Sequence, residues 1–393
     1  MQAMKGMKTL RSGRNRRKWI YVLLLMGLLG LSGCGSPSSA SVEMSSQTEL
    51  VKTGSMELQY AENFAVDYYE DGYKMLTTLP DSKRYLLVPE GQPVPRGLDE
   101  DVSILQEPLQ NIYLVASGVM DMFASLDAVG QIRFSGQKQE NWYIQTAKDA
   151  MAAGDMIYAG KYSKPDYELL VSEGCDLAIE NRMITHSPEV VEMLQSFDIP
   201  VMIEYSSYEQ HPLGKVEWVK FFGALTGKEA EAEEAFAEQT EILEKVESGE
   251  KTGKTIAFFY VTSNGLIQVR QSTDYIPKLI ELAGGRYIFE DLEDSGSGRS
   301  TLNMQVEDFY AGARDADILI YNSSIDGGVT TLDELIGKCN ILKDFKAVQE
   351  GQVYCTTNDM YQQSMAIGYL LQDMHTVLTD DDTAKLRYLF LLQ

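Results

Sequence analysis

The chain has 393 residues, of which 44% are hydrophobic and 10% aromatic, so it carries enough apolar side chains for a substantial folded core. A chain of this length usually divides into more than one lobe, and we expect two. With 34 basic and 58 acidic residues, its formal net charge is −24. Such an acidic surface disfavours nucleic acid and anionic lipid as partners, and it suits a basic protein partner or a cationic ligand.

The first 34 residues have the pattern of an export signal. Seven basic residues lie between residues 5 and 18, and residues 19–31 form an uncharged apolar run. This run is shorter than the roughly 20 residues that span a bilayer, and it leads into Leu-Ser-Gly-Cys, which resembles the bacterial lipobox. We therefore predict a lipoprotein signal peptide over residues 1–33 and a lipid anchor on Cys34. The alternative is an uncleaved membrane anchor, and either one places the remaining chain outside the cytoplasm.

A Ser-rich stretch follows Cys34 and contains too few apolar residues to pack, so residues 34–54 are predicted to form a tether. Beyond it, residues 64–69, 73–78 and 84–89 are short runs rich in Val, Leu, Tyr and Thr, separated by turn signals at residues 71–72 and 80–81, and they predict hairpin-connected strands. From residue 111 onward, strands alternate with short helices, which favours a doubly wound, mostly parallel α/β lobe.

Strand signals cease between residues 215 and 248, where helical periodicity takes over. Residues 216–225 predict one helix, and residues 229–246 predict a longer one with glutamates along its polar face. A second strand-and-helix series begins at residue 255. Residues 365–378 and 383–392 are predicted to close the chain as two helices.

The cysteines and histidines predict no resident metal or cofactor. Cys175, Cys339 and Cys355 are widely separated, and no histidine stands at ligand spacing from any of them. In an exported protein, Cys339 and Cys355 could form a disulfide or remain buried thiols, and the sequence leaves both readings open.

The common catalytic motifs are missing from the sequence. It has no GxSxG elbow and no P-loop, and the short HxxE match from His186 to Glu189 arises easily by chance in an acidic chain. We predict that the chain is not an enzyme. The rival readings are an extracellular α/β enzyme, a lipoprotein that binds bare zinc or manganese, and a structural surface lipoprotein.

Several short motifs, in their order along the chain, resemble one family: the ABC-transporter substrate-binding lipoproteins of the ferric-siderophore and cobalamin class. Those that resemble the first lobe are residues 175–181 (CDLAIEN), 187–190 (SPEV), 198–201 (DIPV) and 208–218 (YEQHPLGKVEW). Those that resemble the second lobe are residues 275–285 (YIPKLIELAGG) and 306–320. The resemblance covers roughly residues 55–393. Lys215, where arginine is commoner, and the extra N-terminal strands depart from the family.

This resemblance implies an α/β fold of two doubly wound, Rossmann-like lobes joined by a single long α-helix, here with extra N-terminal β-strands. The expected domains are an N-terminal lobe over residues 55–227, a linker helix over 228–250 and a C-terminal lobe over 251–393. It also implies a monomer that captures a small molecule between its lobes and delivers it to an ABC permease. An iron-siderophore-type chelate is the first choice of cargo, and cobalamin or haem is the alternative.

A ligand between such lobes would contact the loops that follow the carboxyl ends of the strands. These loops contain aromatic and cationic side chains, which suit a bulky, flat or anionic ligand such as a metal chelate. The candidate ligand-binding residues are Trp142, Tyr143, Lys161, Tyr162, Arg182, Arg270 and Tyr361.

Members of the resembled family dock to the permease through one acidic residue on each lobe. By local match these residues are Glu189 and Glu307, with Glu209 as a competing candidate in the first lobe. Because Glu189 and Glu307 both stand at predicted helix starts, favourable interaction with the helix dipole is the alternative explanation for their presence.

Overall fold

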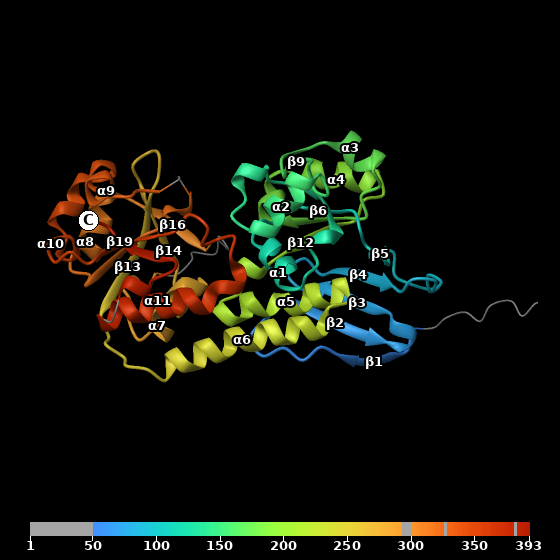
Figure 1. The fold of residues 1–393 in the computed structure, drawn as a ribbon, viewed down its shortest axis with the longest axis horizontal. Coiled ribbons are helices and arrows are strands. Elements are labelled where there is room, and N and C mark those ends of the chain that lie inside the picture. Colours follow the sequence, from blue (N-terminus) through green and yellow to red (C-terminus); the bar gives the residue numbers. More distant parts are fainter. Residues whose placement is uncertain (1–49, 293–299, 326–327, 381–382) are drawn as a thin grey trace, which may run out of the picture. The chain divides into compact units, whose positions relative to one another are not determined.

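Three large β-sheets, a two-stranded ribbon and the helices around them make up the part of the chain that the computed structural model describes, which is residues 50–292, 300–325, 328–380 and 383–393 (Figure 1). These residues belong to one compact unit, residues 47–393. The predicted signal peptide, Cys34 and almost all of the tether lie outside the described residues. Within them, no helix has both the length and the apolar character needed to cross a bilayer.

The first sheet is the N-terminal addition, and it is antiparallel except for its last strand pair. Its strands follow the order of the chain: β1 (Lys52–Ser55), β2 (Phe64–Tyr69), β3 (Lys74–Thr78), β4 (Lys83–Val88) and β5 (Val102–Gln106). Three of these strands, β2 to β4, were predicted from runs of strand-forming residues between turn signals, and the structure confirms them. Sequence reasoning missed β1 and β5, which are the edge strands.

The second sheet is fully parallel and has the order β12-β11-β6-β7-β8. Its strands are β6 (Ile112–Leu114), β7 (Ile132–Ser135), β8 (Ile157–Tyr158), β11 (Leu177–Asn181) and β12 (Val201–Glu204). The connecting helices are α1 (Val119–Ser125), α2 (Gln145–Ala153), α3 (Tyr167–Ser172) and α4 (Pro188–Ser196), with a small ribbon of β9 (Gly160–Lys161) and β10 (Lys164–Pro165). The chain winds outward from β6 in both directions, so the strand order reverses between β6 and β11.

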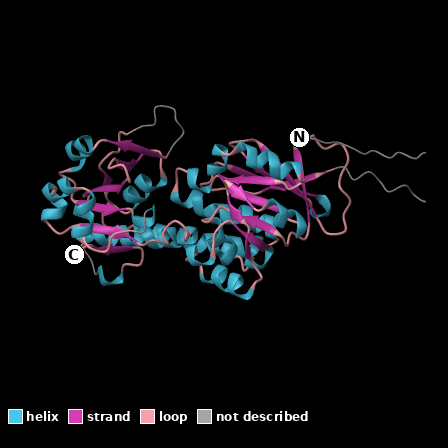
Figure 2. Cartoon of the chain, turned by 90° about the horizontal axis from the view of Figure 1, so that it is seen from above, coloured by secondary structure: helices cyan, strands magenta, loops and turns pink. Residues whose placement is uncertain are grey.

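The third sheet has the order β16-β14-β13-β17-β18-β19, with β15 also paired to β13. Its strands are β13 (Thr255–Val261), β14 (Ile267–Arg270), β15 (Arg286–Tyr287), β16 (Thr301–Met304), β17 (Ile318–Tyr321), β18 (Val353–Thr356) and β19 (Leu389–Leu391). The helices of this lobe are α7 (Tyr275–Leu282), α8 (Val306–Ala313), α9 (Leu332–Lys338), α10 (Lys346–Gln349) and α11 (Ile367–Thr379). Helices flank the strands of both lobes (Figure 2), and successive strand residues enter cores on opposite faces of each sheet.

Two predictions for the second lobe were wrong. Residues 383–392 were expected to be a helix, but the segment begins with one 3₁₀ turn (Thr383–Lys385) and ends in β19, which pairs with β18 along the sheet edge. Arg270 was expected to lie in a loop that follows a strand, but it is the last residue of β14, which forms a hairpin with β13. In both places, hydrogen bonds to a neighbouring strand decide the local structure, and a single segment's pattern does not reveal them.

Helices α5 (Pro212–Thr226) and α6 (Glu229–Glu247) lie between the two parallel-strand lobes in the chain and pack along each other (Figure 1). Gly227 ends α5 in the left-handed conformation, with a φ of 71°. Close approach needs a residue without a Cβ at Gly223, because a Cβ there would lie 2.6 Å from the Cβ of Ala232. The predicted long helix that joins the lobes is therefore present as α6, with α5 beside it.

Every residue of α5 from Pro212 to Leu225 is buried, including three charged ones. One of them, Glu217, holds the chain that leads into β2: its carboxylate accepts hydrogen bonds from the backbone N–H groups of residues 59, 60 and 61 at 2.8–2.9 Å. Glu209 accepts the next two, from residues 62 and 63, and also the indole N–H of Trp218. Two buried carboxylates thus bind five consecutive amides, and we call this arrangement the carboxylate staple.

The lobes also touch directly through the loop after β18. The side-chain amide of Gln362 donates to the carbonyl oxygen of Asn141 and accepts from the backbone N–H of Tyr143, both at 2.8 Å. The carboxylate of Asp121 on α1 accepts the N–H of Met365 at 2.7 Å. These contacts, which we call the Gln362 clamp, join residues more than 200 positions apart in the sequence.

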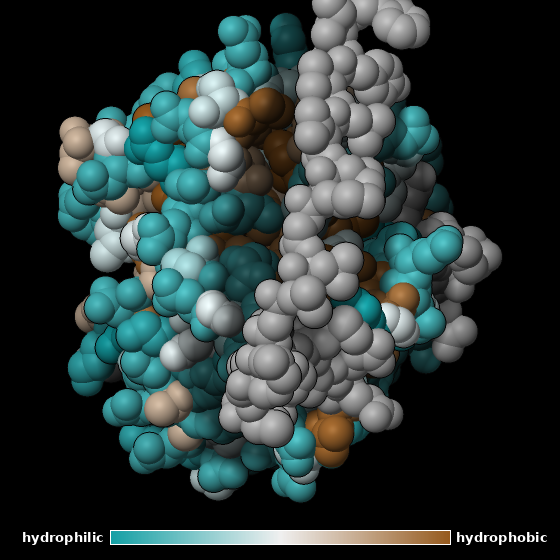
Figure 3. All heavy atoms as spheres, turned by 90° about the vertical axis from the view of Figure 1, so that its right-hand side faces the viewer, coloured by the Kyte–Doolittle hydropathy of each residue, from teal (hydrophilic) through white to brown (hydrophobic). Residues whose placement is uncertain are grey.

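The surface at the end of the molecule that carries β1 and β4 is mostly hydrophilic (Figure 3), with apolar residues gathered in smaller patches. The helical segment α6 likewise exposes most of its glutamates, while its apolar stripe, which includes Phe236 and Leu243, is buried. The strong negative charge of the chain is therefore carried largely at its surface, as solvation requires.

The carboxylate staple makes a stability prediction. Glu217→Gln replaces one acceptor oxygen with an NH₂ group that faces backbone donors, so it should lower the free energy of unfolding by about 2–4 kcal/mol. Urea unfolding of the full-length chain measures this change. Glu231→Gln, which alters an exposed residue on α6, is the control and should change stability by about 0.5 kcal/mol or less. Equal stability of both variants would contradict the structural role of the staple.

Candidate ligand cleft

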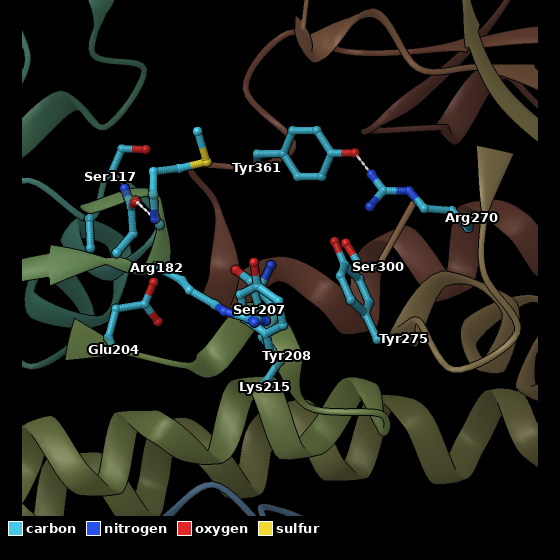
Figure 4. Close-up of a pocket in the computed structure, with 14 residues that line it drawn as sticks. Ser117, Arg182, Glu204, Ser207, Tyr208, Lys215, Arg270, Tyr275, Ser300 and Tyr361 are labelled. Carbon is cyan, nitrogen blue, oxygen red and sulfur yellow. Dashed lines mark hydrogen bonds between the residues drawn. The ribbon is translucent and has the colours of Figure 1, made fainter. Parts of the chain in front are cut away.

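A cavity of about 240 Å³ opens between the two lobes (Figure 4). One wall is the N-terminal lobe: residues 116–118 follow β6, Asn181 ends β11 and residues 182–183 follow it, and Glu204 ends β12. Since β6 and β11 flank the reversal of strand order, this wall is the switch point at which doubly wound sheets bind ligands. The other wall belongs to the C-terminal lobe and consists of Arg270, Tyr275, Ser300 and Tyr361.

The C-terminal wall is organised around Arg270. Its guanidinium pairs with Asp274 at 3.2 Å and donates a second hydrogen bond to the hydroxyl of Tyr361. The side-chain amide of Asn322 donates to the same hydroxyl at 2.7 Å. Burial raises the pKa of Tyr361 to about 12, so this phenol stays protonated at neutral pH.

The N-terminal wall presents one cation and one carboxyl group. The guanidinium of Arg182 stacks over the ring of Tyr208, 4.6 Å from its centroid. Glu204 is buried, and one of its oxygens accepts hydrogen bonds from the backbone N–H and the hydroxyl of Ser206. Burial raises the pKa of Glu204 above its ordinary value.

Between the walls stands Lys215 from the first turn of α5 (Figure 4). Only 4% of this residue is exposed, and its ammonium lies 4.7 Å from the centroid of the Tyr275 ring. Burial lowers the pKa of Lys215, and Glu204, Tyr361 and Asp274 oppose this effect. The helix that bears Lys215 starts at Pro212, where the Nδ1 atom of His211 accepts the N–H of Leu213 at 3.1 Å and caps the first turn.

Of the seven predicted ligand-binding residues, the structure brings three into the cavity: Arg182, Arg270 and Tyr361. Trp142 is fully buried, and its indole N–H donates to the hydroxyl of Ser135. The remaining three lie outside the lining: Tyr143 has an exposed ring, Lys161 is exposed on β9, and Tyr162 packs on the core beside that ribbon. These four residues follow β7 and β8, on the side of the sheet away from the switch point, so we do not include them in the proposed site.

Sequence reasoning missed several residues of the cavity, chiefly Lys215, Glu204, Tyr208 and Tyr275. Lys215 had stood out as a departure from the resembled family, but an ordinary amphipathic pattern assigns a helical lysine to solvent. The local sequence could have indicated its burial, because the other residues of the first turn of α5 are Pro, Leu and Gly, none of which is charged.

The predicted docking residues Glu189 and Glu307 are both exposed, in the first turns of α4 and α8. The competing candidate, Glu209, is only 2% exposed and is held in the carboxylate staple. A residue so placed cannot face a partner, and the hypothesis that Glu209 docks to the permease is wrong.

The thiols and histidines form no metal site in the described part of the chain. No group of three or more His, Cys, Asp or Glu side chains there is arranged to hold a metal ion. Cys339 and Cys355 are buried thiols in the structure, which decides between the two readings of the sequence.

Two lobes with parallel central strands and a cavity at the switch point define an α/β solute-binding protein. Comparison with known proteins agrees: the family model described as periplasmic binding protein matches residues 118–360, and the chain belongs to this family of transport binding proteins. The family includes the ferric-siderophore, cobalamin and haem type, which confirms the resemblance and the fold class predicted from the sequence. Its members bind a small solute for an ABC permease and are not enzymes.

Individual relatives are distant but cover most of the chain. An uncharacterised lipoprotein of Methanocaldococcus jannaschii is 24% identical and aligns with 91% of this chain and 92% of its own length. Among solved structures, a periplasmic haem-binding protein of Vibrio cholerae has a TM-score of 0.54 at 14% identity, covering 68% of this chain and 98% of its own. A Fe³⁺-hydroxamate transport protein of Saccharomonospora viridis has a TM-score of 0.53 at 16% identity, covering 69% and 93%.

Proposed function

We propose that the chain is the extracytoplasmic solute-binding component of an ABC importer, and that it binds an iron-siderophore-type metal chelate in the cavity between its lobes and delivers it to the permease. The observation that carries this proposal is the cavity itself. It lies at the switch point of one lobe, faces the second lobe, and is lined by three cations and three tyrosines. Such a lining suits a ligand that is both anionic and partly aromatic or apolar.

The named relatives support the choice of cargo and the location. One structural neighbour is named for transport of a Fe³⁺ hydroxamate and another for binding haem, and two sequence relatives are named lipoproteins. Cobalamin or haem is the alternative cargo, because Tyr208, Tyr275 and Tyr361 offer ring faces to a macrocycle. An extracellular enzyme is the alternative of another class.

The cargo is tested by titrating the full-length chain with ferric siderophores, haem and cobalamin while tryptophan and tyrosine fluorescence is recorded. We expect quenching that saturates at one ferric chelate per chain, because the cavity is lined by tyrosines that a bound chelate would quench. The ligand recovered from the complex should be chemically unchanged by mass spectrometry. Saturation by haem or cobalamin alone would favour the alternative cargo, and recovery of a modified ligand would favour the enzyme.

Permease docking is proposed for Glu189 and Glu307, which are exposed at helix starts in different lobes. Replacing both with Lys reverses the charge that would meet basic residues of the permease, so ligand uptake by cells should fall at least about tenfold while ligand affinity stays unchanged. Glu231→Lys, on an exposed face of α6, is the matched control and should leave uptake intact. A loss of affinity in the double variant would contradict the docking role.

A lipid anchor is proposed on Cys34, and it would hold the chain on the outer face of the cell membrane. Cys34→Ala removes the thiol that would carry the lipid, so most of the protein should appear in the medium or the soluble fraction. Fractionation followed by immunoblotting measures this distribution. Retention of the variant in the membrane fraction would instead favour an uncleaved anchor at residues 19–31.

A further inference from the structure

Lys215 lacks the partners that a buried ammonium ordinarily has. Only 4% of the residue is exposed, and its ammonium lines the cavity between the lobes. Among the described residues, no side-chain or backbone oxygen accepts a hydrogen bond from this ammonium or forms an ion pair with it. Its one close electrostatic contact there is a cation–π interaction with the ring of Tyr275. An ammonium has three N–H donors, and leaving them unsatisfied in a buried site is costly.

The same helix provides an internal comparison at Lys220. Its side chain is also 4% exposed and also lies over an aromatic ring, that of Phe236 at 4.6 Å. Lys220, however, pairs with Glu233 at 2.9 Å and with Glu217 at 3.7 Å. Equal burial with opposite pairing shows that the fold supplies acceptors where a lysine is structural, and that it supplies none at Lys215.

A second unused donor faces the same cavity. The hydroxyl oxygen of Tyr361 already accepts hydrogen bonds from Arg270 and Asn322, which occupy both of its lone pairs. Its own proton is therefore directed elsewhere, and no described residue accepts it. The charged groups of the lining are Arg182, Lys215, Arg270 and Glu204, and Asp274 pairs with Arg270 at 3.2 Å. Three cations against two carboxyl groups leave a local excess of positive charge in a chain whose net charge is −24.

The cavity is also small. Its volume of about 240 Å³ lies below the roughly 300–1,000 Å³ of pockets that enclose a drug-sized ligand. Unused donors and an excess of cations in so small a space suit one anionic group, with the remainder of a larger ligand outside the cavity.

From these observations we propose that the cavity is an oxyanion subsite. A carboxylate or phosphate group of the transported solute forms an ion pair with the ammonium of Lys215 and accepts a hydrogen bond from the hydroxyl of Tyr361. The inference rests on the proposed solute-binding function and specifies the chemistry of the solute. Lys215 is then the residue that selects for anionic solutes, and the cost of burying it without a partner is recovered when the solute binds.

The test compares Lys215→Met with wild type and with Lys215→Arg, using the full-length chain. The probes are ferric citrate, which presents carboxylates, ferrioxamine B, a ferric hydroxamate without a carboxylate, iron-free citrate and inorganic phosphate. Calorimetric titration gives affinities, and thermal unfolding gives Tm. We expect Lys215→Met to lose roughly 10- to 100-fold in affinity for the oxyanion that wild type binds, and Lys215→Arg to retain most of it.

The Tm of the unliganded variants separates a binding role from a structural one. Removing a buried charge that has no partner should leave the Tm of Lys215→Met equal to or above that of wild type. Lys220→Met, the matched control, should lower Tm, because it strands Glu217 without its cation. A fall in Tm for Lys215→Met with unchanged oxyanion affinity would show a structural lysine and overturn the proposal.

The probes also separate this inference from the proposed function. If ferric chelates bind wild type and Lys215→Met equally well, the oxyanion subsite is refuted and the chelate-binding function stands. If only iron-free citrate or phosphate raises the Tm of wild type, and does so only with Lys215 present, the subsite stands and the iron chelate is refuted as cargo. If none of the four probes binds wild type, the proposal fails.

Discussion

Helix α5 can be buried on every side only because the segment before β2 is held against it. Glu217 and Glu209 bind the amides of residues 59–63, and charge-assisted hydrogen bonds of this kind are among the strongest that a protein makes. Gly214 permits the contact, since a Cβ there would lie 2.9 Å from the carbonyl oxygen of Tyr60. The carboxylate staple therefore joins the additional N-terminal sheet to the helix on which both lobes rest.

The same helix links architecture to the ligand site. Its contacts include β2 and β3 of the first sheet, α1 of the N-terminal lobe, and α7 and α11 of the C-terminal lobe. A side chain at its first turn consequently lies between the lobes, and a side chain further along lies inside the packed interior. Lys215 and Lys220 occupy these two positions, which is why one faces a cavity and the other is enclosed by carboxylates.

Local pattern predicted much of the fold and less of the site. Runs of strand-forming residues between turn signals located β2 to β4, because such runs depend on neighbouring residues. The rule that ligands bind beyond strand ends located Arg182, Arg270 and Tyr361, because it depends on topology. Trp142 was placed in the site by the same rule, yet burial in the core depends on how distant segments pack. Lys215 was missed for a related reason: its apolar neighbours in the first turn of α5 indicate burial, but nothing near it in the sequence reveals that a second lobe covers its helix.

Because of the Gln362 clamp, the two lobes are connected at two separate places. One route between the lobes is covalent and runs through α6; the other consists of three hydrogen bonds made by Gln362 and Asp121. Each such bond contributes about 0.5–1.5 kcal/mol, so together they bias the unliganded chain toward closure by a few kcal/mol. The apparent affinity of any solute whose entry required the lobes to part would be lowered by the free energy of these bonds, and the proposed delivery to a permease would require breaking only a few weak bonds.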